Sequence, residues 1–140
     1  MSGQGLISIR IPLSLLDVFR TAALSSKYTL HGAARTLISG ARGLTSVQLT
    51  ALQEPPRALQ SPRVSLYVGA QCLSILTERA RTSQLSASSI FRRLAYGLFV
   101  NRSIRFVQNT ANKEWLLVSV QNSSEIGFFD RTGEKRDAAS

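Results

Sequence analysis

A chain of 140 residues, 44% of them hydrophobic, is long enough for one compact domain or for two small units that share a core, and too apolar to be disordered throughout. Its formal net charge is +9, and the excess is concentrated in residues 1–110, where 13 basic residues face only three acidic ones. Fourteen of the 17 basic residues are arginines, whose planar guanidinium suits phosphates and guanine edges, so the composition favours a polyanionic partner.

The same composition excludes several classes of protein. The single cysteine, Cys72, cannot form an internal disulfide or a cysteine-rich zinc site, which fits a reducing compartment. No apolar run approaches the roughly 20 residues of a membrane span. Residues 1–12 lack the basic and apolar regions of a secretory signal. We therefore expect a cytoplasmic protein with no membrane contact.

The first predicted elements are one strand and two helices. Residues 7–11 alternate between apolar and polar and predict a strand that Pro12 ends. A helix is predicted over residues 14–25, and a polar break follows it. Thr29 is the predicted N-cap of the second helix, which runs to about Arg42. The residues expected to face the core are Ile7, Ile9, Ile11, Leu15, Leu16, Phe19, Ala23, Ala33, Ala34, Leu37 and Ile38.

The same pattern returns at a constant offset of 57 positions, without a gap. A second alternating strand covers residues 64–68 and ends at Gly69, and a helix is predicted over residues 71–81. Ser86 takes the place of the N-cap, and the last helix runs to about Val100. The core-facing residues of this repeat are Val64, Leu66, Val68, Cys72, Leu73, Leu76, Ala80, Ile90, Phe91, Leu94 and Leu98.

Between and after the repeats the pattern changes. Residues 45–62 form a linker, in which residues 45–53 allow one short amphipathic helix through Val47, Leu49 and Leu52 before three prolines stop it.

The C-terminal part is predicted to be β-structure followed by a tail. Residues 102–130 form a β-hairpin extension, with strands over residues 104–108 and 115–120 and a further short strand over residues 126–129. Residues 131–140 are polar and are expected to fray.

A five-residue strand needs a partner for its backbone, and two equivalent strands in one chain can pair with each other. We therefore predict an α+β fold in which two tandem strand–helix–helix units, residues 1–44 and 63–101, share one core. This order resembles the ribbon–helix–helix superfamily of DNA-binding proteins over residues 6–101. It resembles above all the tandem, single-chain members of the TraY type, which are accessory proteins of plasmid conjugation.

The resemblance implies that the two strands form an antiparallel ribbon that enters the major groove of DNA. Alternation places Ser8 and Arg10 of one strand, and Arg63, Ser65 and Tyr67 of the other, on the outward face, where they would contact base edges. Neither strand carries an acidic residue. The resemblance also implies phosphate contacts at the start of each second helix, where free amides attract an anion. The residues assigned to these contacts are Lys27, Thr29, His31, Ser86 and Ser88. Further positive charge is expected from Arg35, Arg92 and Arg93.

Unequal strands should prefer a non-palindromic DNA site. The expected function is sequence-specific binding of double-stranded DNA, as a relaxosome accessory protein at a plasmid transfer origin. The expected partners are a relaxase or other plasmid-transfer protein and further copies of the chain on DNA. A transcriptional repressor or a plasmid-partition regulator of the same fold would have the same sequence features.

Three rival classes are weaker. An enzyme is not expected, because one histidine and one cysteine are present and no Gly-rich phosphate loop or metal-ligand cluster appears, so no cofactor or metal is predicted either. A protein-interaction adaptor would use whatever part of Phe106, Trp115, Phe128 and Phe129 stays exposed. RNA binding would need aromatic residues on the ribbon, which offers only Tyr67.

Overall fold

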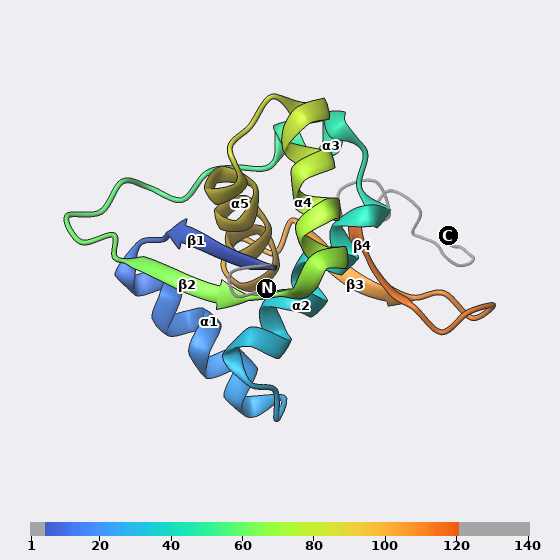
Figure 1. Ribbon diagram of the computed structural model, residues 1–140, viewed down its shortest axis with the longest axis horizontal. Helices are drawn as coiled ribbons and strands as arrows, with labels where there is room; N and C mark the ends of the chain where they lie inside the picture. The colour runs from blue at the N-terminus through green and yellow to red at the C-terminus, as the bar shows by residue number, and fades with distance from the viewer. Residues whose placement is uncertain (1–4, 121–140) are drawn as a thin grey trace, which may run out of the picture.

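The computed structural model describes residues 5–120 and shows an α+β fold in which the two predicted strands pair. Strands β1 (Leu6–Arg10) and β2 (Arg63–Tyr67) form an antiparallel two-stranded sheet, the ribbon, with Ser8 opposite Ser65 (Figure 1). Ile7, Ile9 and Leu66 are buried beneath the ribbon. The alternation predicted for both strands is therefore confirmed, because a pleated strand sends successive side chains to opposite faces.

Four helices follow the strands in the predicted order: α1 (Leu13–Ser25), α2 (Leu30–Gly40), α4 (Gly69–Ser83) and α5 (Ala87–Phe99). The predicted N-caps are confirmed, since Thr29 Oγ1 accepts from the amide of Gly32 at 2.9 Å and Ser86 Oγ accepts from the amide of Ser89 at 3.0 Å. Helix α4 begins two residues earlier than predicted, because Gly69, with φ +87°, turns the chain directly from strand to helix. Helix α2 ends at Gly40 and continues as the 3-10 turn η1 (Ala41–Gly43).

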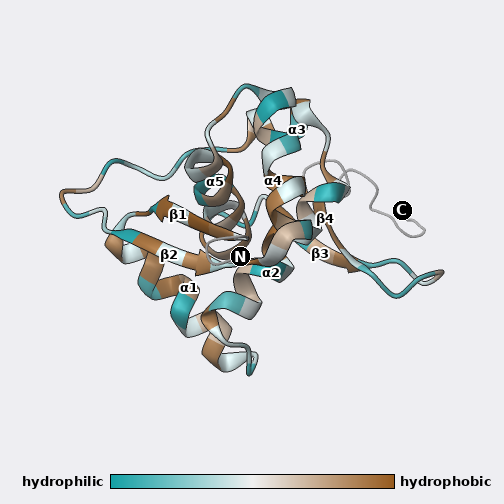
Figure 2. Ribbon diagram, in the orientation of Figure 1, coloured by the Kyte–Doolittle hydropathy of each residue, from teal (hydrophilic) through white to brown (hydrophobic). Residues whose placement is uncertain are grey.

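The apolar faces of these helices form one core. Helix α1 packs on α5 and α2 packs on α4, so each unit is packed against the other. Phe19 and Phe91 meet edge to face, with ring centroids 5.4 Å apart, and join α1 to α5. Figure 2 shows apolar and polar residues alternating along α1, as a helix with one buried face requires.

The linker contains one helix, α3 (Ser46–Ala51). Thr45 is its N-cap and forms a capping box with Gln48. Leu49 is fully buried, but Val47 is 78% exposed, so the prediction that both line the buried face of this helix is wrong. Two residues that are two positions apart on a helix point to nearly opposite sides, so only one of the two side chains can face the core. The rest of the linker loops out beside the ribbon (Figure 1).

The predicted hairpin is also present. Strands β3 (Ile104–Gln108) and β4 (Trp115–Ser119) pair antiparallel and pack against α2, η1 and α5. Glycines make room for it, because a Cβ on Gly43 would clash with the carbonyl oxygen of Leu117. The predicted strand over residues 126–129, with Phe128 and Phe129, and the tail of residues 131–140 lie outside the described residues. Within residues 5–120, no helix is long and apolar enough to cross a bilayer.

We expect Gly43→Ala to destabilise the protein by about 1–3 kcal/mol, because the added methyl group meets backbone that cannot move aside. Urea denaturation followed by the fluorescence of Trp115, the only tryptophan, reports this loss directly from the hairpin. Thr110→Ala, at the exposed hairpin turn, is the control and should change little. Equal stability of the two variants would contradict this account of the hairpin contact.

Candidate nucleic-acid interface

The outward face of the ribbon carries six exposed side chains. They are Leu6, Ser8 and Arg10 on β1 and Arg63, Ser65 and Tyr67 on β2. Leu6 is 47% and Tyr67 54% exposed, although both are large enough to form part of a core. The five residues predicted to contact base edges therefore share one accessible face.

The register brings the two arginines of this face together. Arg10 lies opposite Arg63 at one end of the ribbon, and Leu6 lies opposite Tyr67 at the other. Arg63 Nη1 donates to Ser8 Oγ at 3.3 Å, and Arg10 Nη1 donates to the carbonyl of Ser61 at 3.1 Å. Like charges directly opposite each other destabilise a strand pair. A ligand that supplies negative charge would relieve this repulsion.

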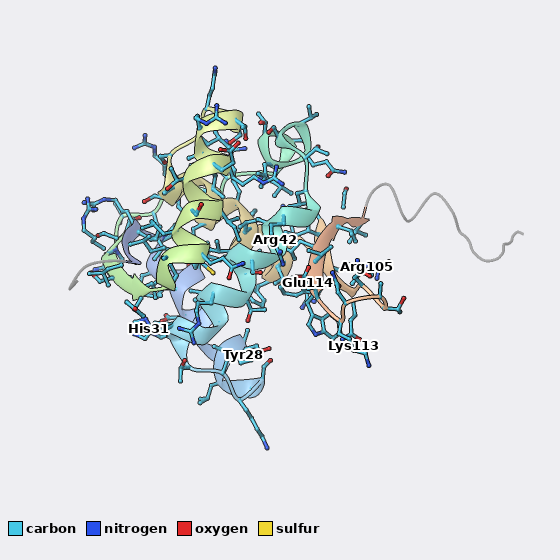
Figure 3. All side chains as sticks on the ribbon, turned by 45° about the vertical axis from the view of Figure 1, so that its right-hand side comes forward. Tyr28, His31, Arg42, Arg105, Lys113 and Glu114 are labelled. Carbon is cyan, nitrogen blue, oxygen red and sulfur yellow. The ribbon has the colours of Figure 1, made fainter. Side chains whose placement is uncertain are left out.

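Both outer edges of the ribbon are held by the second helices. The amide of Arg10 donates to Ser88 Oγ at 3.2 Å, and the amide of Tyr67 donates to His31 Nδ1 at 2.9 Å. Figure 3 shows His31 beside the ribbon. The offset of 57 relates Arg10 to Tyr67 and His31 to Ser88, so the two hydrogen bonds are equivalent.

The carbonyls of the same two ribbon residues are held as well. Arg92 Nη1 donates to the carbonyl of Arg10 at 2.9 Å, and Arg35 Nη1 donates to the carbonyl of Tyr67 at 3.3 Å. Arg35 and Arg92 are again 57 positions apart. We call His31, Arg35, Ser88 and Arg92 the clasp residues. Each clasp residue forms a hydrogen bond with the strand of the other unit, so both ribbon edges are attached to α2 and α5.

The residues predicted to contact phosphate have mixed roles. Thr29 and Ser86 cap α2 and α5, while the side chains of His31 and Ser88 accept from the ribbon backbone. Lys27 is exposed in the turn before α2. Within residues 5–120, the backbone amides of His31 and Ser88 have no hydrogen-bond partner. They remain available to an anion beside the ribbon.

Two of the arginines expected to add to the positive field, Arg92 and Arg93, share one acidic partner. Glu54 accepts from Arg92 Nε at 2.9 Å and from the hydroxyl of Ser89, and its carboxylate lies 3.7 Å from Arg93 Nε. Arg93 also donates to the carbonyls of Thr50 and Leu52. Arg92 and Arg93 therefore tie α5 to the linker, and together with Glu54 they add one net positive charge where two were expected.

The environment of Glu54 sets its pKa. Burial alone would raise the pKa of Glu54, but the hydrogen bonds from Arg92 and Ser89 and the charges of Arg92 and Arg93 outweigh it and lower the pKa below its ordinary value of 4.5. No local motif marks Glu54 in the sequence. The one feature that could have drawn attention to it is the scarcity of acidic residues, since Glu54 is one of only three among the first 110 residues.

Residues that could suggest other chemistry have structural roles. Cys72 is buried on α4, and its Sγ lies 3.5 Å from the carbonyl oxygen of Arg35. Burial raises the pKa of the Cys72 thiol, which opposes formation of a thiolate. Among residues 5–120, no three His, Cys, Asp or Glu side chains gather as a metal site would require. Comparison with protein-family models, with curated proteins and with solved structures finds no match to this chain.

We expect Ser88→Ala and His31→Ala each to cost about 0.5–1.5 kcal/mol, because each removes the acceptor of a ribbon amide. Hydrogen exchange should then accelerate at one amide only, that of Arg10 in Ser88→Ala and that of Tyr67 in His31→Ala. Each variant is the control for the other. Unchanged exchange at both amides would show that the two side chains do not hold the ribbon.

The pKa of Glu54 generates a second prediction. Because folding lowers this pKa, the ion pairs stabilise the fold fully above pH 4.5 and lose their effect as the pH falls below it. Glu54→Gln should therefore cost about 1 kcal/mol at pH 7, a value reduced by the 35% exposure of the side chain. The difference from the unmodified protein should shrink when urea denaturation is repeated at pH 3.5.

The matched control is Glu78→Gln, which breaks the exposed pair of Glu78 with Arg81 on α4. Exposed pairs of this kind contribute little, so this variant should differ from the unmodified protein by only a few tenths of a kcal/mol at either pH. A loss in Glu54→Gln that does not depend on pH would contradict the assigned ion pairs.

Proposed function

We propose that this protein binds double-stranded DNA in a sequence-specific manner, with the β1–β2 ribbon in the major groove. The observation that carries the proposal is the outward ribbon face, where Arg10 and Arg63 stand opposite each other with no acidic residue on either strand. The major groove is about 12 Å wide and accepts a two-stranded ribbon. Arginine is also the side chain that reads guanine in this groove most often.

We infer further that the two strand–helix–helix units form the single-chain equivalent of a ribbon–helix–helix dimer. An approximate two-fold relation supports this, because the offset of 57 maps Ser8 onto Ser65 and these two residues face each other at the ribbon centre. The hydrogen bonds from the amide of Ile11 to the carbonyl of Pro62 and from the amide of Val68 to the carbonyl of Gly5 obey the same relation. The clasp residues obey it too.

The flanks of the ribbon suit the phosphate backbone. The first turns of α2 and α5 lie against opposite edges of the ribbon, since His31 holds β2 and Ser88 holds β1. Free amides and the positive end of a helix dipole attract phosphate oxygens. In this proposal the helix starts, with Lys27, Thr29 and Ser86, position the protein on DNA, and the ribbon reads the bases.

The biological role we propose is that of a relaxosome accessory protein at a plasmid transfer origin. The support is the inequality of the two strands, because an oriented site marks one direction on DNA. A relaxase or another plasmid-transfer protein, and further copies of this chain on DNA, would be the partners. A transcriptional repressor or a plasmid-partition regulator would use the same ribbon, and the genomic position of the bound sites would distinguish the three roles.

A specific observation favours a protein-interaction role as the second candidate. A largely apolar cavity of about 320 Å³ lies between α1, α2, α5 and the hairpin. Tyr28, Phe99, Phe106 and Trp115 contribute aromatic rings to it, and Trp115 is 50% exposed. An adaptor would bind an apolar side chain of a partner protein there. Binding of a protein partner that survives loss of all duplex affinity would favour this candidate.

We expect the protein to bind duplex oligonucleotides more tightly than single strands, with an affinity that falls steeply as salt is added. On a duplex selected from a random pool, Arg10→Ala should weaken binding by about 5- to 150-fold, the effect of one lost bidentate contact. Fluorescence anisotropy between 50 and 300 mM salt measures both effects.

The control is Arg105→Ala, which removes the same charge from the exposed hairpin strand β3 (Figure 3). It should reduce affinity only slightly. An equal loss of affinity in the two variants would show that binding depends on net charge alone. A preference for single strands would overturn the proposed function.

A further inference from the structure

The two ends of the ribbon are chemically different. One end carries the opposed pair Arg10 and Arg63, and the other carries the opposed pair Leu6 and Tyr67. The difference follows from the repeat itself, because the offset of 57 maps Leu6 onto Arg63 and Arg10 onto Tyr67. Antiparallel pairing then gathers both arginines at one end and both apolar side chains at the other. A ribbon made from two identical strands could not do this.

The side chain of each of the two arginines forms one hydrogen bond within the protein. Arg10 is oriented by the carbonyl of Ser61 through one guanidinium nitrogen, and Arg63 by the hydroxyl of Ser8. A guanidinium has five N–H donors, so each side chain keeps enough of them to bind both O6 and N7 of guanine. Among the described residues, no carboxylate forms an ion pair with either arginine. This end is therefore suited to one or two G·C pairs.

The opposite end offers different contacts. Leu6 and Tyr67 are about half exposed and present apolar surface with a single hydroxyl. In the major groove such surface suits the methyl group of thymine, and Leu6 cannot form a hydrogen bond with any base edge. Ser8 and Ser65 between the two ends can donate or accept and distinguish the bases less sharply.

We infer that the DNA site has a fixed polarity, with guanine at the Arg10–Arg63 end of the ribbon and thymine at the Leu6–Tyr67 end. This inference rests on the proposed function. A strand rises about 3.3 Å per residue and B-DNA about 3.4 Å per base pair, so the two contacts lie about four base pairs apart. The protein would bind such a site in one orientation, with its hairpin always on the same side.

The test selects bound duplexes from a random pool with the full chain and with two symmetrised variants. Arg63→Leu combined with Tyr67→Arg gives both strands the same outward residues, Leu, Ser and Arg. Leu6→Arg combined with Arg10→Tyr does the same with Arg, Ser and Tyr. All four positions are exposed, so both variants should fold, which thermal unfolding verifies.

We expect the unmodified protein to select a non-palindromic motif and both symmetrised variants to select palindromes. Replacing the guanine of the motif with adenine should weaken binding of the unmodified protein by about 5- to 150-fold. A palindromic motif for the unmodified protein, or a directional motif for a symmetrised variant, would overturn the inference and leave duplex binding intact. Failure of all three proteins to retain any duplex would instead overturn the proposed function, and the inference with it.

Discussion

The backbone groups on the outer edges of a two-stranded sheet have no neighbouring strand, and the rest of this fold depends on how they are satisfied. Here α2 and α5 supply the partners. His31 and Ser88 accept from the ribbon amides, while Arg35 and Arg92 donate to the ribbon carbonyls. A five-residue strand pair is marginal by itself. Because every clasp residue belongs to the opposite unit, strand pairing and helix packing support each other.

The local sequence pattern was sufficient to predict the helices and strands, but not the contacts between them. Alternation identified β1 and β2, and the caps Thr29 and Ser86 identified the starts of α2 and α5, because these signals lie within a few residues of each other. The opposition of Arg10 and Arg63 depends on strand register, which no single strand contains. The pairing of Glu54 depends on Arg92, 38 positions away, and the contact of His31 depends on Tyr67, 36 positions away, so neither could be read from local pattern. The exposure of Val47 shows the limit of reading a six-residue helix, where one misplaced residue changes the buried face.

The hairpin adds a second surface on the far side of the helices. Helix α2 contacts both β2 and β4, so it lies between the ribbon and the hairpin. The attachment depends on the missing side chains of Gly40 and Gly43, which let Phe106 and Leu117 approach the backbone. Arg42 and Glu114 add an ion pair at 3.3 Å across this contact (Figure 3). A molecule held at the hairpin would leave the ribbon accessible.

The linker between α3 and β2 has a consequence for how such a protein responds to dilution and to mutation. A tether of this length keeps the two units at an effective concentration in the millimolar range. The two strands of the ribbon therefore stay paired even when the protein is very dilute. In a homodimer every substitution appears twice, once in each strand. In this chain a substitution in β2 leaves β1 as it was, and the two halves of the outward ribbon face are free to evolve separately.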